Sequence, residues 1–164
     1  MTKSIEVRWP DYYQPRNCPV HVRNELDMAA APEHVWAWLI RATLWPTWYA
    51  NSANVKILEG KELDLRKGTR FRWKTFGVTI TSTVLEYVSR ERIAWNAHAF
   101  GFDGYHAWVL QPSARGCHVL TEETQHGWLA RLGKLLMPHR MYKFHQVWLE
   151  GLEAKAHGSL PPAA

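Results

Sequence analysis

His106 is the residue whose type and setting most directly suggest chemistry. It alternates with Trp108 in the strand-like segment 102–111, so both side chains are expected on one apolar face. An imidazole there can act as an acid, a base or a hydrogen-bond donor to an oxygen of a bound molecule. The commoner alternative is a core histidine that is hydrogen-bonded to the backbone, because binding sites contain few polar groups.

Two adjacent carboxylates, Glu122 and Glu123, lie in the last strand-like segment. Successive strand residues face opposite sides, so one of the two points inward in either register. An inward carboxylate can act as a general base in an aldol-type ring closure or a dehydration. It can instead pair with an arginine or a histidine, and the alternation alone does not choose between the two glutamates.

His145 is a third candidate, one helical turn from Met141 on the side expected to face a cavity. The sequence has nine histidines, but no His-x-x-x-His pair and no HExxH motif. We therefore expect no metal and no other cofactor. Cys117 adjoins a turn glycine, and no serine has the setting of a catalytic nucleophile.

Aromatic residues dominate the composition, with ten tryptophans, six tyrosines and five phenylalanines in 164 residues. Each large ring buries roughly 150–250 Å², so these rings must line a core, a cavity or an interface. The candidates for stacking on a bound ring are Trp73, Trp95, Trp108 and Trp148. Their alternative is ordinary core, and in a small domain a cavity wall is part of the core.

The elements that must position these residues follow from periodicity. A strand is expected at 19–28, two short helical segments after Pro32 and around Trp45, and a C-terminal helix from Gly127 to about Ala156, kinked or broken near Pro138. Between the helices, strands are predicted at 55–59, 69–76, 78–88, 92–99, 102–111 and 118–125. The short breaks favour an antiparallel meander, whose apolar face only the last helix is long enough to cover.

Length and charge narrow the class of protein. With 46% hydrophobic residues in 164, we expect residues 1–18 as an arm, 19–157 as one domain and 158–164 as a tail. The formal charge is +5, but the basic residues are scattered, so nucleic acid is not an expected partner.

No run approaches the ~20 apolar residues of a membrane span, and no signal-peptide core is visible. A cytoplasmic protein with two free thiols, without stable membrane insertion, is expected.

Several of these residues together resemble the START-related (SRPBCC) superfamily, especially its bacterial polyketide cyclase/dehydrase branch. The resemblance spans roughly residues 19–155 and is carried by Ala31, Pro32, Val35, Trp36, Leu39, Trp45, Pro46, Trp48, Tyr49, Gly68, Thr69, Pro112, Gly116, Glu123 and Gly127. It implies an α+β helix-grip fold, in which a curved antiparallel sheet of six to seven strands wraps around a long C-terminal helix. It also implies a pocket for sterol-, lipid- or polyketide-like molecules, and it favours Glu123 as the inward carboxylate.

The leading hypothesis is a binding protein, monomeric or homodimeric, for a hydrophobic, ring-containing metabolite. Its expected contacts are Trp73, Trp95, His106, Trp108, Met141, His145 and Trp148. The first alternative is an enzyme that folds and cyclises a poly-keto chain, with His106 or Glu123 moving protons. The second is a protein-interaction module similar to the ATPase-activator relatives of the superfamily.

Overall fold

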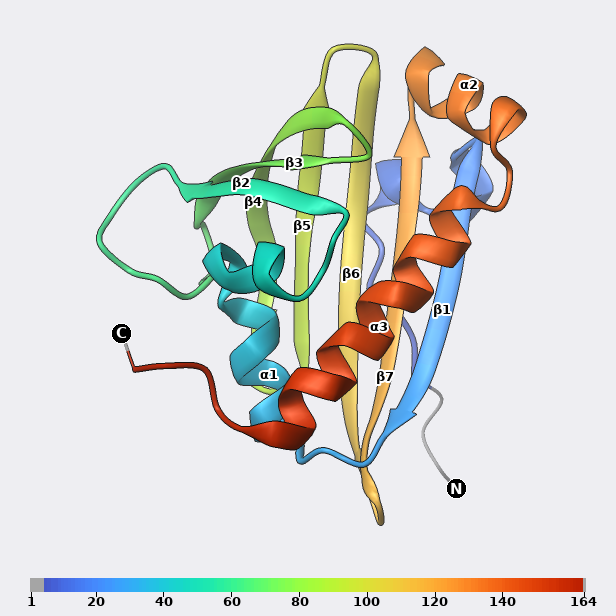
Figure 1. The fold of residues 1–164 in the computed structure, drawn as a ribbon. Coiled ribbons are helices and arrows are strands. Elements are labelled where there is room, and N and C mark those ends of the chain that lie inside the picture. The colour runs from blue at the N-terminus through green and yellow to red at the C-terminus, as the bar shows by residue number, and fades with distance from the viewer. Residues whose placement is uncertain (1–4, 164) are drawn as a thin grey trace.

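Seven antiparallel strands form one sheet in the order β1-β7-β6-β5-β4-β3-β2. The computed structural model describes residues 5–163. The sheet curves around a long helix that crosses its concave face (Figure 1). The strands are β1 (Val20–Met28), β2 (Ser52–Ile57), β3 (Arg70–Thr75), β4 (Val78–Val88), β5 (Arg92–Ala99), β6 (Phe102–Ser113) and β7 (Gly116–His126).

Tight turns and irregular pairings give the sheet its connections and its curvature. Phe76 and Gly77 join β3 to β4 with φ values of 50° and 81°, the left-handed backbone of a two-residue hairpin turn. The pairing of β2 with β3 shifts register between Ala53 and Lys56, and β4 shifts against β5 between Val84 and Glu86. Such irregularities bend and twist strands, which brings the sheet around its concave face.

The helices follow the predicted order. α1 (Pro32–Ile40) and the 3-10 helix η3 (Ala42–Thr47) come after β1, and α2 (Trp128–Leu136) and α3 (Arg140–Gly158) come after β7. The predicted interruption near Pro138 separates α2 from α3. The buried face of α3 contains Trp148, Leu149, Leu152 and Ala156, at the three- and four-residue spacing of one helix face. The predicted α+β helix-grip architecture is therefore confirmed.

The N-terminal segment lies on the opposite, convex face of the sheet. It contains the short helices η1 (Asp11–Tyr13) and η2 (Pro15–Asn17) and lies behind the sheet in Figure 1. The Tyr13 ring stacks on Tyr105 with centroids 5.2 Å apart, and its hydroxyl donates to Asp103 at 2.7 Å. The ring centroid of Trp9 lies 5.8 Å from that of Tyr105.

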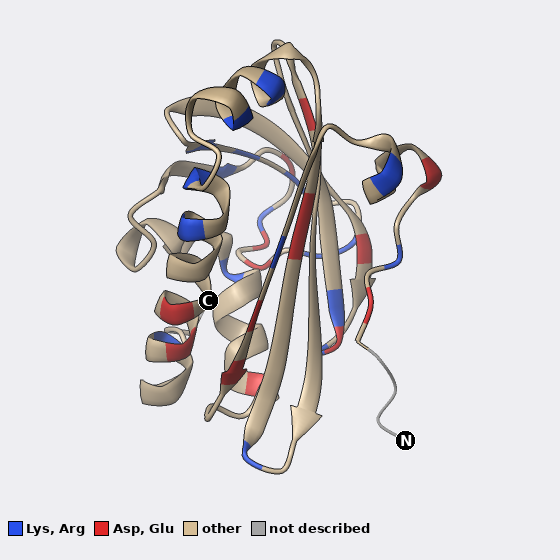
Figure 2. Ribbon diagram, turned by 90° about the vertical axis from the view of Figure 1, so that its right-hand side faces the viewer, with Lys and Arg blue, Asp and Glu red and all other residues tan. Residues whose placement is uncertain are grey.

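Charged residues are spread over helices, strands and loops, with acidic residues among the basic ones (Figure 2). The expectation of scattered rather than clustered basic residues agrees with this view. Within residues 5–163, no helix is both long and apolar enough to cross a membrane.

Candidate functional site

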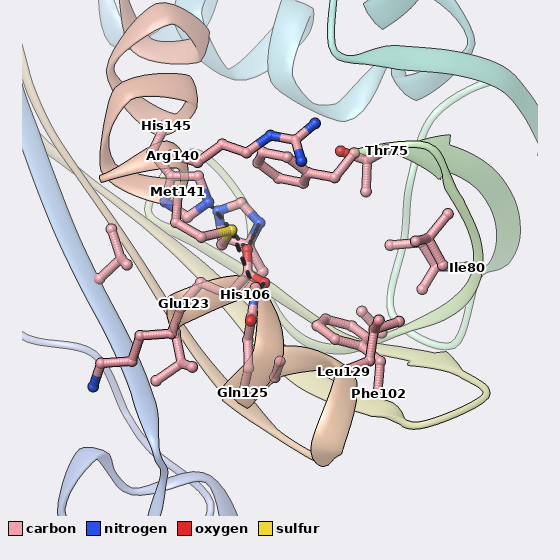
Figure 3. Close-up of a pocket in the computed structure, with 18 of the residues that line it drawn as sticks. Thr75, Ile80, Phe102, His106, Glu123, Gln125, Leu129, Arg140, Met141 and His145 are labelled. Carbon is pink, nitrogen blue, oxygen red and sulfur yellow. Dashed lines mark hydrogen bonds and ion pairs between the residues drawn. The ribbon is translucent and has the colours of Figure 1, made fainter. Parts of the chain in front are cut away.

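A cavity of about 280 Å³ lies between the concave face of the sheet and helices α2 and α3. Its inner wall includes the rings of Trp73, Trp95 and Trp148. At its other end lie Leu132 and Leu136 of α2, whose side chains are exposed. This end of the cavity therefore borders solvent, whereas the lining residues His106, Glu123 and His145 are buried (Figure 3).

Six of the seven predicted contact residues line this cavity: Trp73, Trp95, His106, Met141, His145 and Trp148. The seventh, Trp108, is fully buried but lies outside the cavity wall. Its ring contacts Trp148 at 5.1 Å and His106 at 5.4 Å between centroids, so it supports two lining residues from the core. The prediction that His106 and Trp108 lie on one face of the strand is correct, but the cavity extends over only part of that face.

The aromatic wall is held by ring-to-ring contacts. Tyr49 stacks on Trp148 with centroids 4.5 Å apart and planes 9° apart. Trp45 packs against Trp73, Trp95 and Trp148 from the end of η3, with centroid distances of 5.3, 5.5 and 5.1 Å. The predicted bulky segment around Trp45 and Tyr49 thus fixes the wall on one side.

The polar part of the cavity is a cluster of three buried side chains from three elements. His106 on β6 and Glu123 on β7 are direct partners in the strand register, and His145 comes from α3. Glu123 Oε2 lies 3.3 Å from His106 Nδ1 and 3.1 Å from His145 Nε2. The three residues converge in Figure 3, and we call them the His-Glu-His cluster.

Neighbouring side chains hold this cluster in place. Gln125 Nε2 donates to Glu123 Oε1 at 2.6 Å. The single hydroxyl hydrogen of Thr121 is donated to the Ala107 carbonyl oxygen at 3.2 Å, so its oxygen accepts the hydrogen of His106 Nε2 at 2.7 Å. In this arrangement the neutral His106 ring carries its proton on Nε2 and turns the Nδ1 lone pair toward the carboxylate. In the other tautomer Nδ1 donates to Glu123 Oε2 and Nε2 accepts from Thr121.

Burial and neighbouring groups together set the charge states of His106 and Glu123. Burial lowers the pKa of His106 to about 3, against the opposing influence of Glu123, so the ring is neutral near pH 7. Burial alone would raise the pKa of Glu123, but the hydrogen bond from His145 and the charge interactions with His106 and His145 outweigh it. The net pKa of Glu123 is lowered, so a carboxylate faces the cavity.

The structure also separates the two adjacent glutamates. Glu122 points away from the cluster, where its carboxylate contacts His21 Nε2 at 2.6 Å and Arg23 Nη1 at 2.8 Å. Glu122 is thus the carboxylate that pairs with an arginine and a histidine. Glu123 is the one on the cavity side, as the family resemblance favoured.

Sequence reasoning missed other lining and supporting residues. Gln125 and Thr121 are two residues either side of Glu123 on β7, so strand alternation alone could have placed them on its face. The lining residues contributed by turns and by α2 have no such signal, because their position depends on how α2 folds back over the sheet. They include Phe76, Leu129, Leu132, Gly133, Leu136 and Met137.

Comparison with known proteins agrees with this geometry. The hypothetical protein jhp0584 of Helicobacter pylori has a similar structure, with a TM-score of 0.88, 30% identity and coverage of 95% of this chain and 99% of that one. The di-domain ARO/CYC StfQ of the steffimycin biosynthetic pathway has a TM-score of 0.69 at 16% identity, over 87% of this chain and 52% of its own. TTHA0849 of Thermus thermophilus has a TM-score of 0.68 at 19% identity, over 85% of this chain and 100% of its own.

No curated protein matches the sequence significantly. A family model described as "Polyketide cyclase / dehydrase and lipid transport" matches residues 19–157. These residues include the whole sheet and all but the last residue of α3. The chain therefore belongs to the polyketide cyclase/dehydrase and lipid transport family.

Proposed function

We propose that the protein binds a small, hydrophobic, ring-containing molecule that carries at least one oxygen. The observation that carries this proposal is a cavity with aromatic walls and the His-Glu-His cluster at its inner end. Its volume of about 280 Å³ is near the lower end of the roughly 300–1,000 Å³ of small-molecule sites. A polyketide- or lipid-type molecule of two or three fused rings suits this volume.

Unpartnered donors in the wall add support. The indole nitrogens of Trp95 and Trp148 are buried without a hydrogen-bond partner among the described residues, and both tryptophans line the cavity. A buried donor left without a partner costs about 1–3 kcal/mol. Neither nitrogen has surface open to the cavity, so an oxygen of a bound molecule would accept from it only after a shift of the ring.

The test is to fill the cavity and measure binding of a simple ring compound, 1-naphthol, by its fluorescence. Ala97 is buried and lines the cavity, so Ala97→Phe should occupy the space that the probe needs. We expect at least tenfold weaker binding. Ala154→Phe makes the same change at an exposed position of α3 and should bind like the unmodified protein.

Thermal unfolding of both variants shows whether the fold is kept. Unchanged naphthol affinity in a folded Ala97→Phe protein would contradict a binding site in this cavity. Native mass spectrometry of the freshly purified chain then identifies the class of any natural ligand.

A second candidate function is catalysis of a cyclisation or dehydration on a bound poly-keto chain. The observation that favours it is the Glu123 carboxylate, which lies among two imidazoles on the cavity wall. In this scheme Glu123 removes a proton next to a ketone, and a histidine returns a proton to the oxygen. Glu123→Gln should abolish turnover of a poly-keto thioester while naphthol binding changes less than threefold. Turnover that survives this change would exclude the role.

A further inference from the structure

Three potential metal ligands converge on one point of the cavity wall. His106 Nδ1, Glu123 Oε2 and His145 Nε2 come from β6, β7 and α3, and the three residues are buried. The potential ligand atoms of these residues all lie within 4.8 Å of one another. Spacing along the chain does not reveal the group, because only the fold brings the three elements together.

The separations of the nitrogens from the oxygen match those around a tetrahedral ion. Metal bonds of about 2.0–2.2 Å at a tetrahedral angle place neighbouring ligand atoms roughly 3.3–3.5 Å apart. Here Glu123 Oε2 is 3.3 Å from His106 Nδ1 and 3.1 Å from His145 Nε2.

The hydrogen-bond pattern leaves a place for a cation. Because Thr121 accepts the Nε2 hydrogen of His106, the Nδ1 lone pair of that ring faces a carboxylate oxygen. In this tautomer two buried acceptors face each other, and either a cation between them or a shift of the ring proton to Nδ1 relieves their repulsion.

Glu123 and His145 each direct one atom at the same point. Gln125 Nε2 donates to Glu123 Oε1 at 2.6 Å, which leaves Oε2 as the oxygen that can bind an ion. His145 Nδ1 is buried without a hydrogen-bond partner among the described residues. His145 Nε2 donates to Glu123 Oε2 at 3.1 Å in the absence of a metal, so an ion bound here takes the place of that hydrogen and the ring proton moves to Nδ1.

We propose that His106 Nδ1, Glu123 Oε2 and His145 Nε2 form a binding site for one divalent transition-metal ion, and that this ion is zinc. Two imidazoles and one carboxylate suit zinc and its neighbours better than calcium or magnesium, which prefer oxygen ligands. All three residues line the cavity, so the remaining coordination position faces it. The 2+ ion and one carboxylate together carry a net charge of +1, which favours cavity ligands with an anionic or carbonyl oxygen.

Zinc binding by the tag-free, chelator-treated chain tests this proposal without reference to any organic ligand. Calorimetry should show one zinc ion per chain, and Glu123→Gln and His145→Gln should each weaken binding at least a hundredfold. His118→Gln is the matched control, because that partly exposed histidine also lies near two carboxylates, 2.6 Å from Asp27 and 3.6 Å from Glu25. It should leave zinc affinity unchanged.

X-ray absorption of the zinc-loaded unmodified protein adds a readout that needs no variant. Two imidazoles in the coordination sphere are expected from the His-Glu-His cluster, whereas the surface group would supply one. No stoichiometric binding, a single imidazole, or loss of zinc affinity in His118→Gln alone would overturn the proposal. Circular dichroism in chelator shows that each variant is folded, and a rise in Tm with zinc should occur in the unmodified protein but not in Glu123→Gln.

Discussion

Thr121 is the residue that contacts Nε2 of His106. Its hydroxyl lies between the His106 ring and the Ala107 carbonyl, with no exposed surface. Because one hydroxyl hydrogen can serve only one acceptor, donation to the Ala107 oxygen favours the His106 tautomer with its proton on Nε2. The chemistry of the cavity thus depends on a residue that does not line it.

Thr121→Val should therefore lower the free energy of unfolding by about 1–3 kcal/mol, because it leaves the His106 Nε2 hydrogen buried without an acceptor. Urea unfolding followed by tryptophan fluorescence measures the change. Thr79→Val, at an exposed position of β4, is the control and should change stability by less than about 0.5 kcal/mol. Equal stability of the two variants would mean that His106 does not depend on Thr121.

The two cysteines differ in reactivity. Both are free thiols, as expected, but Cys117 is buried and Cys18 is partly exposed. Burial raises the pKa of Cys117 to about 11, so near pH 8 only about one thiol in a thousand is the reactive thiolate. Burial also raises the pKa of Cys18, but its partial exposure admits a reagent.

A thiol reagent at pH 8 should therefore label one cysteine per folded chain, and Cys18→Ser should remove that labelling. In denaturant both thiols should react. Rapid modification of Cys117 in the folded chain would show that the core around it opens. Peptide mass spectrometry assigns the labelled site.

At the scale of the elements, α2 closes one side of the cavity while making few contacts of its own. Ala130 is its only buried residue within the described chain. The Leu129 amide donates to Gly101 O at 3.0 Å, and Lys134 Nζ donates to Pro19 O at 2.7 Å. The direction of α2 is set mainly at Gly127, where the chain leaves β7 with φ of 102°.

Two glycine substitutions test separately what the turn at Gly127 and the helix α2 contribute to stability. A Cβ on Gly127 would lie 2.2 Å from the Gly101 carbonyl oxygen, so Gly127→Ala combines a clash with a strained φ and should cost more than about 2 kcal/mol. A Cβ on Gly133 meets nothing within 4 Å, and alanine is the better helix former. Gly133→Ala should therefore stabilise the protein by up to about 1 kcal/mol. Thermal unfolding compares them, and similar losses in both would contradict this account of α2.

The strands and helices could be predicted because their signals are local. Alternating side chains mark β3 and β5, and Pro138 marks the break between α2 and α3. The composition of the cavity wall could be predicted only in part. Trp73 and Trp148 could be predicted, because strand alternation and helical spacing place their side chains on the inward faces of their elements. Trp108 shares the face of His106 but lies outside the wall, because packing of neighbouring elements decides where on that face the cavity ends. The meeting of His145 with Glu123 depends on the crossing position of α3, which no local pattern encodes.

At the scale of the whole molecule, the sheet separates two groups of aromatic residues. The concave face holds the cavity and the large tryptophan core. The convex face holds a small cluster of Tyr13, Ala94, Tyr105 and Ala107, against which Val7 and Trp9 pack. The N-terminal arm completes this second cluster, so the arm contributes to stability from the side away from the cavity.

Tyr13→Ala tests that separation. Tyr13 is buried against Tyr105 and donates to Asp103, so its loss should reduce the free energy of unfolding by about 2–4 kcal/mol. Naphthol affinity should stay within twofold, because none of the atoms removed lies on the cavity side of the sheet. The neighbouring Tyr12 is 56% exposed, and Tyr12→Ala should lower stability by less than about 1 kcal/mol. If Tyr13→Ala weakens naphthol binding in proportion to its loss of stability, the two faces are energetically coupled through β6, and the arm belongs to the binding apparatus.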